Sequence, residues 1–181
     1  MPPDGRTVLH HISAAKDRLR DADIQLGYLA AATDQLHHPA DAAAKEVEVR
    51  SPFLAWLVFA RQVSGSIQKA WETAGRPLEF KDWWDSLEED ERHLYFWRSR
   101  NDGLRWGDPI MNEVPIVDAE LGAFGYFAFA DGPFKGDPLM PRCQQYTEWL
   151  YKDCLCVAQD KLYDYFRDDA IEAAKDSPLG R

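Results

Sequence analysis

The stretch Ser51-Pro-Phe-Leu-Ala-Trp-Leu-Val-Phe-Ala-Arg-Gln-Val-Ser-Gly-Ser-Ile-Gln-Lys-Ala-Trp-Glu-Thr-Ala-Gly75 decides the fold class. Apolar residues recur in it every three or four positions, which is the spacing of one face of an α-helix. Ser51 offers an N-cap and Pro52 suits the first helical position, so we predict a core helix that begins here and runs to Ala74, ended by Gly75. Its apolar face consists of Phe53, Trp56, Leu57, Ala60, Val63, Ile67, Ala70, Trp71 and Ala74.

Two helical segments are predicted before this stretch. From Val8 to Leu36 the apolar residues follow a seven-residue repeat, which predicts a single helix of about eight turns at the usual 3.6 residues per turn. Pro39 ends it, because the residue before a proline is pushed out of the helical region. Residues 40–50 are rich in alanine and predict a short helical segment. The apolar rows of the long helix are Ile12, Leu19, Leu26 and Thr33, and Ala15, Ala22, Leu29 and Leu36.

Two further helical regions are predicted after it. The first begins near Glu79, can restart at the capping-box pattern Ser86-Leu-Glu-Glu89, and continues to about Trp106, where Gly107-Asp-Pro109 ends it. The second is a long helix from Arg142 to Phe166, followed by an acidic tail expected to fray. The apolar row of that last helix is Tyr151, Leu155, Ala158, Leu162 and Tyr165, with Leu150, Cys154 and Val157 beside it.

An irregular segment separates these two regions. From Gly107 to Pro141 the chain holds five of its eleven glycines and five of its eleven prolines. Within it, residues 113–118 and 122–130 predict strands, the second with aromatic residues on both faces, so we expect a β-hairpin or an aromatic flap over the bundle. The predicted fold is therefore mainly α: one domain, residues 1–181, built as a four-to-five-helix up-down bundle with an inserted irregular or β-hairpin segment at about 108–141.

The overall charge restricts the classes of partner. A formal net charge of −10 and a pI near 4.9 argue against duplex DNA, whose affinity for proteins comes from many phosphate neutralisations. An uncharged run such as Ser51 to Ala60 is far too short to cross a bilayer, and the N-terminus has no basic-then-apolar signal pattern, so we expect a soluble cytoplasmic protein without membrane contact. In that reducing compartment Cys143, Cys154 and Cys156 are expected to be small buried hydrophobes rather than redox or metal residues.

Positive charge is concentrated in Arg98-Ser-Arg-Asn-Asp-Gly-Leu-Arg-Trp-Gly107, which we call the arginine stretch. It follows a strongly acidic run, residues 79–91, so the basic character is sharply confined. A confined cationic site suits a single phosphate or carboxylate better than a long polyanion. Helical spacing places Asn101 with Leu94, Trp97 and Leu104 on one face, and an amide on an apolar face needs a hydrogen-bonding partner.

Three segments together resemble the HEPN (higher eukaryotes and prokaryotes nucleotide-binding) superfamily. They are the helix Phe53-Leu-Ala-Trp-Leu-Val-Phe-Ala-Arg-Gln-Val63, the tryptophan-bearing segment Phe80-Lys-Asp-Trp-Trp84, and Arg100-Asn-Asp-Gly-Leu-Arg-Trp-Gly107. In the family the last segment reads Arg-Asn-x-x-x-His followed by a small residue. The resemblance implies a bundle that forms a homodimer with its Arg-Asn helices facing across the two-fold axis. Active members are metal-independent ribonucleases, in which the arginine holds the scissile phosphate and the histidine acts on the ribose 2′-hydroxyl.

Carried over, the resemblance gives Arg100 the phosphate-binding role and Asn101 the orienting role, and these two are the catalytic residues if the protein is an enzyme. Arg105 occupies the histidine position, and an arginine stays protonated and cannot accept the hydroxyl proton. We therefore expect a non-catalytic HEPN-like module, without cofactor or metal, that binds a nucleotide, an RNA phosphate or a partner protein at a dimer interface, in a bacterial stress or defence setting such as a toxin–antitoxin pair. The expected binding residues are Trp97, Arg98, Arg100, Asn101 and Arg105.

Three alternatives stay open. A ribonuclease could use His93 or Asp102 as its base, although helical geometry gives neither residue an obvious path to the hydroxyl proton. A purely structural interaction protein would use the arginines only to pair with the acidic run, and would bury its tryptophans in the core or in a dimer interface. A metal site built from His10-His11 or His37-His38 is disfavoured, because adjacent histidines face apart on a helix.

Overall fold

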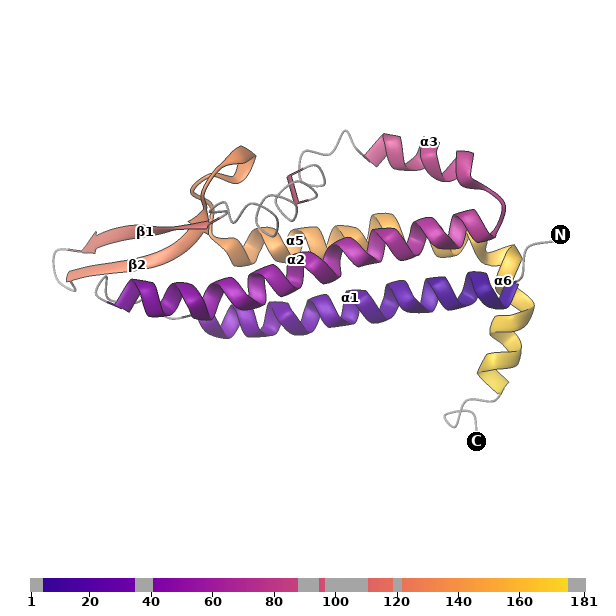
Figure 1. The fold of residues 1–181 in the computed structure, drawn as a ribbon, viewed down its shortest axis with the longest axis horizontal. Coiled ribbons are helices and arrows are strands. Elements are labelled where there is room, and N and C mark those ends of the chain that lie inside the picture. The colour runs from indigo at the N-terminus through magenta and orange to yellow at the C-terminus, as the bar shows by residue number, and fades with distance from the viewer. Residues whose placement is uncertain (1–4, 35–40, 88–94, 97–110, 119–121, 176–181) are drawn as a thin grey trace.

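The structure is a computed structural model that describes residues 5–34, 41–87, 95–96, 111–118 and 122–175. Long helices run side by side along its long axis (Figure 1). The first, α1, runs antiparallel both to α2 and to a continuous helical unit made of α5, the π-helical segment η3, and α6. The bounds of these elements are α1 Gly5–Thr33, α2 Ala42–Thr73, α5 Leu139–Trp149, η3 Leu150–Cys156 and α6 Val157–Lys175. The predicted mainly helical bundle with an inserted hairpin is confirmed.

Helix α1 buries most of the two apolar rows that its sequence predicted; Leu36, where the predicted helix ended, lies outside the described residues. Its most extensive packing is against α2, and it also contacts α5, η3 and α6. The heptad positions Ile12, Ala15, Ala22 and Leu29 are at most 1% exposed, so the repeat marks the face that α1 buries between its two neighbours.

Helix α2 does not begin at Ser51-Pro52 as predicted; it is one uninterrupted helix with Pro52 inside it. A proline in a helix interior lacks the N–H that would bond four residues back and crowds that carbonyl, here the one of Glu48. The helix continues because its apolar face continues: Val49, one turn before the proline, is as fully buried as Phe53 after it. Burial along the whole face overrides the local signal for a helix start.

The end of α2 follows the sequence prediction closely. Gly75 adopts a φ of +75°, and the N–H groups of Gly75 and Arg76 donate to the carbonyls of Glu72 and Trp71, each at 3.0 Å. This pair of bonds is the Schellman motif, which satisfies carbonyls that a helix end leaves free. The chain then turns directly into α3 (Pro77–Leu87).

Helix α3 packs onto the end of α2 through Phe80 and Trp83. Trp83 stacks on Trp71 with ring centroids 5.9 Å apart, and Trp84 stacks on Phe80. Arg76 adds a tie to α6, since its guanidinium lies over the rings of Trp71 and Tyr165 and donates to the carbonyl of Lys161 at 3.2 Å. The predicted continuation of this helical region to Trp106, including the restart at Ser86-Leu-Glu-Glu89, falls mostly outside the described residues.

The predicted hairpin is present as strands β1 (Met111–Asp118) and β2 (Gly122–Phe129), paired antiparallel from Met111 opposite Phe129 to Asp118 opposite Gly122. Its base packs into the bundle, with Met111, Phe127 and Phe129 at most 6% exposed. Toward its far end the hairpin projects past the packed helices, where Val117 is 82% exposed (Figure 1). Only the base, therefore, lies over the bundle as a flap.

The last helical unit is longer than predicted and contains an irregularity that the sequence pattern did not reveal. It begins at Leu139 rather than Arg142, because Pro141 falls in the first turn, where a missing N–H costs no helical bond. It runs to Lys175 rather than ending at Phe166. In η3 each residue turns the chain by less than in an α-helix, which shifts the phase of the apolar row, and Tyr151 is 50% exposed instead of lying in that row.

Among the described helices, none combines the length and the apolar character needed to cross a membrane.

A Pro52→Ala substitution tests the continuity of α2. An interior proline costs a helix about 3 kcal/mol, and the lost restriction of the unfolded chain offsets up to about 1 kcal/mol of the gain. We expect a net increase in unfolding free energy of about 2–3 kcal/mol, measured by urea denaturation. Unchanged or lower stability would instead indicate that the helix starts at Pro52, where proline is favourable.

Candidate functional site

The predicted site residues Trp97, Arg98, Arg100, Asn101 and Arg105 lie outside the described part of the chain. The alternative bases His93 and Asp102 lie outside it as well. What the structure does describe is Tyr95 and Phe96, which immediately precede Trp97, and the surroundings that hold them.

Phe96 is held in the centre of the largest aromatic cluster of the described residues. It is 3% exposed and lies edge-on to Trp56 of α2, with ring centroids 5.1 Å apart. Its centroid is 4.6 Å from that of Tyr146 on α5 and 5.8 Å from those of Phe129 and Phe134. Helix α2, helix α5 and the hairpin base therefore converge on the residue two positions before Arg98.

Tyr95 is held by the turn that follows the hairpin. Its hydroxyl donates to the carboxylate of Asp131 at 3.1 Å, and its ring meets those of Phe129 and Phe134 edge-on. Gly132 lies directly against that ring: it has a φ of +69°, and a Cβ built on it would come within 2.6 Å of the Tyr95 Cδ2 atom. The turn thus requires glycine both for its backbone and for the space that Tyr95 fills.

The same turn is closed by an ion pair to α5. The Arg142 guanidinium donates to Asp137 with nitrogen–oxygen distances of 2.8 and 2.6 Å, and it also lies over the ring of Phe134 at 5.0 Å. Backbone bonds join Phe129 to Asp137 and to Gly136. Tyr95 and Phe96, which precede the arginine stretch in sequence, are therefore fixed by contacts distant in sequence, which no local pattern reveals.

Two glycine substitutions test this anchor as a matched pair. Gly132 and Gly136 both have positive φ, at +69° and +86°, and a side chain in that region costs about 1–2 kcal/mol. Only Gly132 faces Tyr95; an added Cβ at Gly136 meets no described atom within 4 Å. We expect Gly132→Ala to lower the unfolding free energy by about 1–3 kcal/mol more than Gly136→Ala, because it also overpacks the cluster.

Thermal or urea denaturation of both variants measures the difference. Equal losses of stability would show that Tyr95 does not pack against Gly132 in solution.

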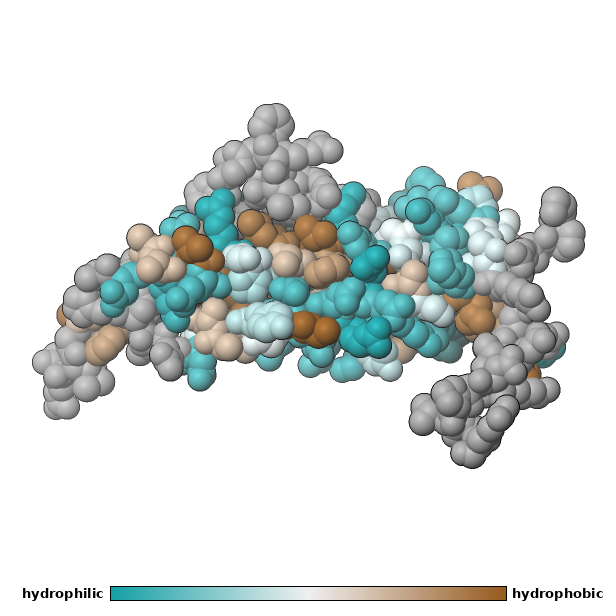
Figure 2. All heavy atoms as spheres, turned by 60° about the horizontal axis from the view of Figure 1, so that its bottom comes forward, coloured by the Kyte–Doolittle hydropathy of each residue, from teal (hydrophilic) through white to brown (hydrophobic). Residues whose placement is uncertain are grey.

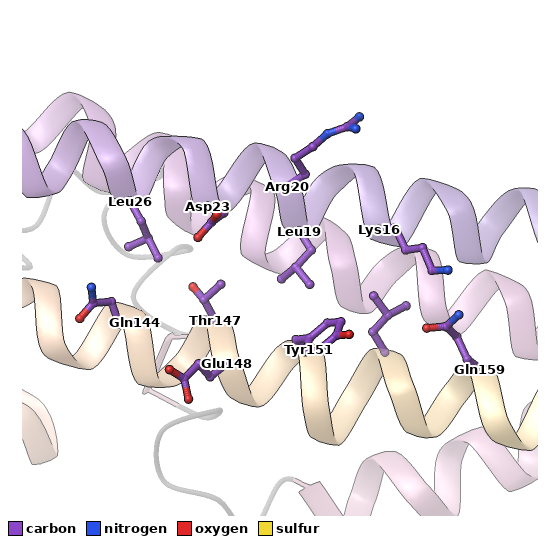
Figure 3. Close-up of a pocket in the computed structure, with 11 residues that line it drawn as sticks. Lys16, Leu19, Arg20, Asp23, Leu26, Gln144, Thr147, Glu148, Tyr151 and Gln159 are labelled. Carbon is purple, nitrogen blue, oxygen red and sulfur yellow. The ribbon is translucent and has the colours of Figure 1, made fainter. Parts of the chain in front are cut away.

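A groove of about 820 Å³ lies between α1 and the α5–η3–α6 unit (Figure 3). Leu19 and Leu26 line it from α1 and Leu155 from η3, so its base is apolar. Thr147 sits deep in it, accepting a hydrogen bond of 3.0 Å from the Trp56 indole and donating to the Cys143 carbonyl at 2.9 Å. One residue of the groove lining, Thr147, is therefore hydrogen-bonded to the same tryptophan that packs against Phe96.

Opposite charges occupy different parts of this groove. Lys16 and Gln159 extend toward each other from opposite walls at one end, and Asp23 points down toward Thr147 and Glu148 further along (Figure 3). Arg20 points away from the facing helix and pairs with Asp17 at 2.9 Å. Positive charge therefore lies at one end of the groove and negative charge further along it. The lining residues are Lys16, Leu19, Arg20, Asp23, Leu26, Gln144, Thr147, Glu148, Tyr151, Leu155 and Gln159.

The π-helical segment η3 forms part of the groove wall and turns Tyr151 into it. Single π-helical turns inside α-helices occur frequently at functional sites. The groove was missed from sequence because the apolar row predicted for residues 142–166 placed Tyr151 in the core. The one sequence signal for a groove was the polar composition of the positions beside Tyr151, and this composition also fits an ordinary solvated surface.

Clusters of metal-binding side chains are not found in the described segments: no three His, Cys, Asp or Glu residues converge there. Cys143 and Cys154 are fully buried, as predicted, and Cys156 is half-buried. Burial raises the pKa of the Cys143 thiol well above its ordinary value, which keeps it protonated and unreactive.

The cysteines should therefore differ in their reaction with thiol reagents. In the native protein at neutral pH we expect Cys156 to be alkylated first, with Cys143 and Cys154 modified only after unfolding, because the thiolate is the reactive form and needs access. Mass spectrometry of peptides after timed labelling measures the order. Rapid native modification of Cys143 would contradict the buried, protonated state.

No family model matches the chain, and neither curated proteins nor solved structures provide a match. The resemblance to the HEPN superfamily therefore rests on the residues of segments 53–63, 80–84 and 100–107 themselves.

Proposed function

We propose that the protein is a non-catalytic HEPN-like module that binds a nucleotide or an RNA phosphate through its arginine stretch. The observation that carries the proposal is the anchoring of Tyr95 and Phe96 at the junction of α2, α5 and the hairpin. A cationic cluster that starts from a fixed point can hold its guanidinium groups in place for a ligand, and this pre-organisation strengthens binding.

The elements around this point fit the proposal. The segment Phe53–Val63 lies in the central helix α2, and the segment Phe80–Trp84 packs on the end of that helix through Trp71. These are the two other segments on which the family resemblance depends. The second segment packs on Trp71, which lies on the same helix as the first, so both belong to one packed unit; this supports carrying the Arg-Asn role over to Arg100 and Asn101.

The chemistry of the stretch favours binding over cleavage. Arg98, Arg100 and Arg105 supply charge-assisted donors, and the planar guanidinium can bind a phosphate through two parallel hydrogen bonds. None of the three can remove a proton from a ribose hydroxyl at neutral pH. The stretch therefore keeps groups that bind a phosphate, but Arg105, at the position of the family's histidine, cannot serve as a base.

Binding of a short single-stranded RNA and of ATP to the purified full-length chain tests the proposal. A hydrogen bond to a charged group contributes about 1.5–3 kcal/mol, so Arg100→Ala should weaken binding roughly tenfold to a hundredfold. Arg18→Ala is the matched control, because Arg18 lies on α1, is partly exposed and pairs locally with Asp21 at 3.1 Å. It removes the same charge and should leave the affinity nearly unchanged.

Three outcomes would contradict the proposal. The first is absence of binding to both ligands, and the second is equal weakening by the two variants, which would indicate general charge attraction. The third is cleavage of RNA in EDTA that the Arg100→Ala variant loses, which would make the protein a metal-independent ribonuclease instead.

A further inference from the structure

The outer face of α1 changes character at Ile24. Before it, the solvent-facing side of the helix carries Lys16, Asp17, Arg20 and other charged residues. From Ile24 to Thr33 the sequence Ile-Gln-Leu-Gly-Tyr-Leu-Ala-Ala-Ala-Thr contains no charge in ten residues. Figure 2 looks onto this side and shows a row of brown, pale and tan residues interrupting the teal surface.

This uncharged face is exposed. Ile24 is 49% and Tyr28 62% exposed, and Gly27 and Ala31 are exposed beside them. With Arg20 and Asp34 these residues recur at spacings of four and three, so they form one stripe along the helix, opposite the buried row of Ile12, Ala22 and Leu29. Large apolar side chains in such a stripe indicate a surface that another helix covers.

Gly27 adds an independent indication. A glycine inside a helix costs roughly 0.5–1 kcal/mol relative to alanine. Within the described residues nothing lies within 4 Å of a Cβ built on Gly27, so packing inside the subunit does not require the glycine. Because Gly27 has no side chain, a second molecule can approach the helix backbone closely at this point of the exposed apolar stripe.

The charges at the two ends of the stripe indicate which kind of molecule binds to it. Arg20 and Asp34 each lie seven residues from Gly27, on either side of it, and both are exposed. If two copies of α1 cross antiparallel with Gly27 at the two-fold axis, Arg20 of each copy faces Asp34 of the other. The surface is therefore complementary to itself in charge, as an isologous interface requires.

We propose that the stripe Arg20, Ile24, Gly27, Tyr28, Ala31 and Asp34 pairs with the same stripe of a second copy of this chain. The large side chains of Ile24 and Tyr28 pack over Gly27 and Ala31 of the other copy. Each Arg20 exchanges its local partner Asp17 for Asp34 of the other copy, so that two ion pairs close the ends. The paired segment, residues 20–34, is about 22 Å long at 1.5 Å per residue. This contact differs from pairing across the Arg-Asn helices, which the family resemblance implies, and it leaves Arg100 free for a ligand.

Sedimentation equilibrium of the full-length protein over a range of concentrations tests the pairing. We expect wild type to dimerise and Ile24→Glu to be monomeric, because the substitution buries a carboxylate without a partner. Leu78→Glu is the control: Leu78 on α3 is 75% exposed and lies outside the stripe, so the same change there should leave the dimer intact.

A charge exchange tests the geometry itself. Arg20→Asp should weaken dimerisation about tenfold or more, because it places like charges opposite one another. Adding Asp34→Arg to the same chain should restore the affinity, since each copy again presents opposite charges at the two ends. Circular dichroism of each variant confirms that the subunit remains folded.

The inference is overturned if wild type is monomeric at every concentration, or if the double variant fails to recover dimerisation. It is also overturned if Ile24→Glu still dimerises while Arg100→Ala does not, because the copies would then pair across the arginine stretch. If Arg100→Ala loses RNA or ATP binding but still dimerises, the stripe on α1 and the arginine stretch act independently, as proposed.

Discussion

The indole of Trp56 is the contact on which the rest of the fold depends. It is fully buried on α2, stacks near Phe53, and lies edge-on to Phe96 and Tyr146. Its N–H donates to Thr147, so the one polar atom of the ring is satisfied inside the core. A buried aromatic ring contributes a large apolar area, and its hydrogen bond fixes its orientation. Through this one side chain, α2, α5 and Phe96 are packed together.

Periodicity predicted the elements whose faces are set by burial alone. In α1 the heptad rows identified the buried face, and at Gly75 the helix end follows from a backbone conformation that glycine adopts without strain. The rule failed at Pro52, where a favourable local start signal competes with a continuous apolar face from Val49 to Ala74. Tertiary burial is worth more than the capping preference, so the helix continues through the proline.

What could not be predicted depends on contacts between distant residues. The bond from Trp56 to Thr147 joins positions 91 apart, and that from Tyr95 to Asp131 joins positions 36 apart. The π-helical segment η3 shifts the phase of its helix, so a repeat that assumes 3.6 residues per turn places Tyr151 on the wrong side. Pattern analysis also misses the groove, because its two walls are distant in sequence: one comes from α1 and the other from a helical unit more than a hundred residues later. The role of the arginine stretch, residues 98–107, as a binding site was predicted from its charge and remains a prediction.

The acidic surroundings restrict what the arginine stretch can bind. The chain carries −10 overall, and its residues 79–91 are strongly acidic, so a long polyanion would meet repulsion over most of its length. A single phosphate meets mainly the nearest guanidinium groups, because at physiological salt charges more than about 8 Å away are largely screened. A confined cationic cluster in an acidic protein therefore favours a nucleotide, or one phosphate in a single strand, over duplex nucleic acid. In the proposed pairing of two α1 helices, the exposed Arg20–Asp34 ion pairs at the two ends of the stripe add direction, while the apolar centre of the stripe supplies most of the energy.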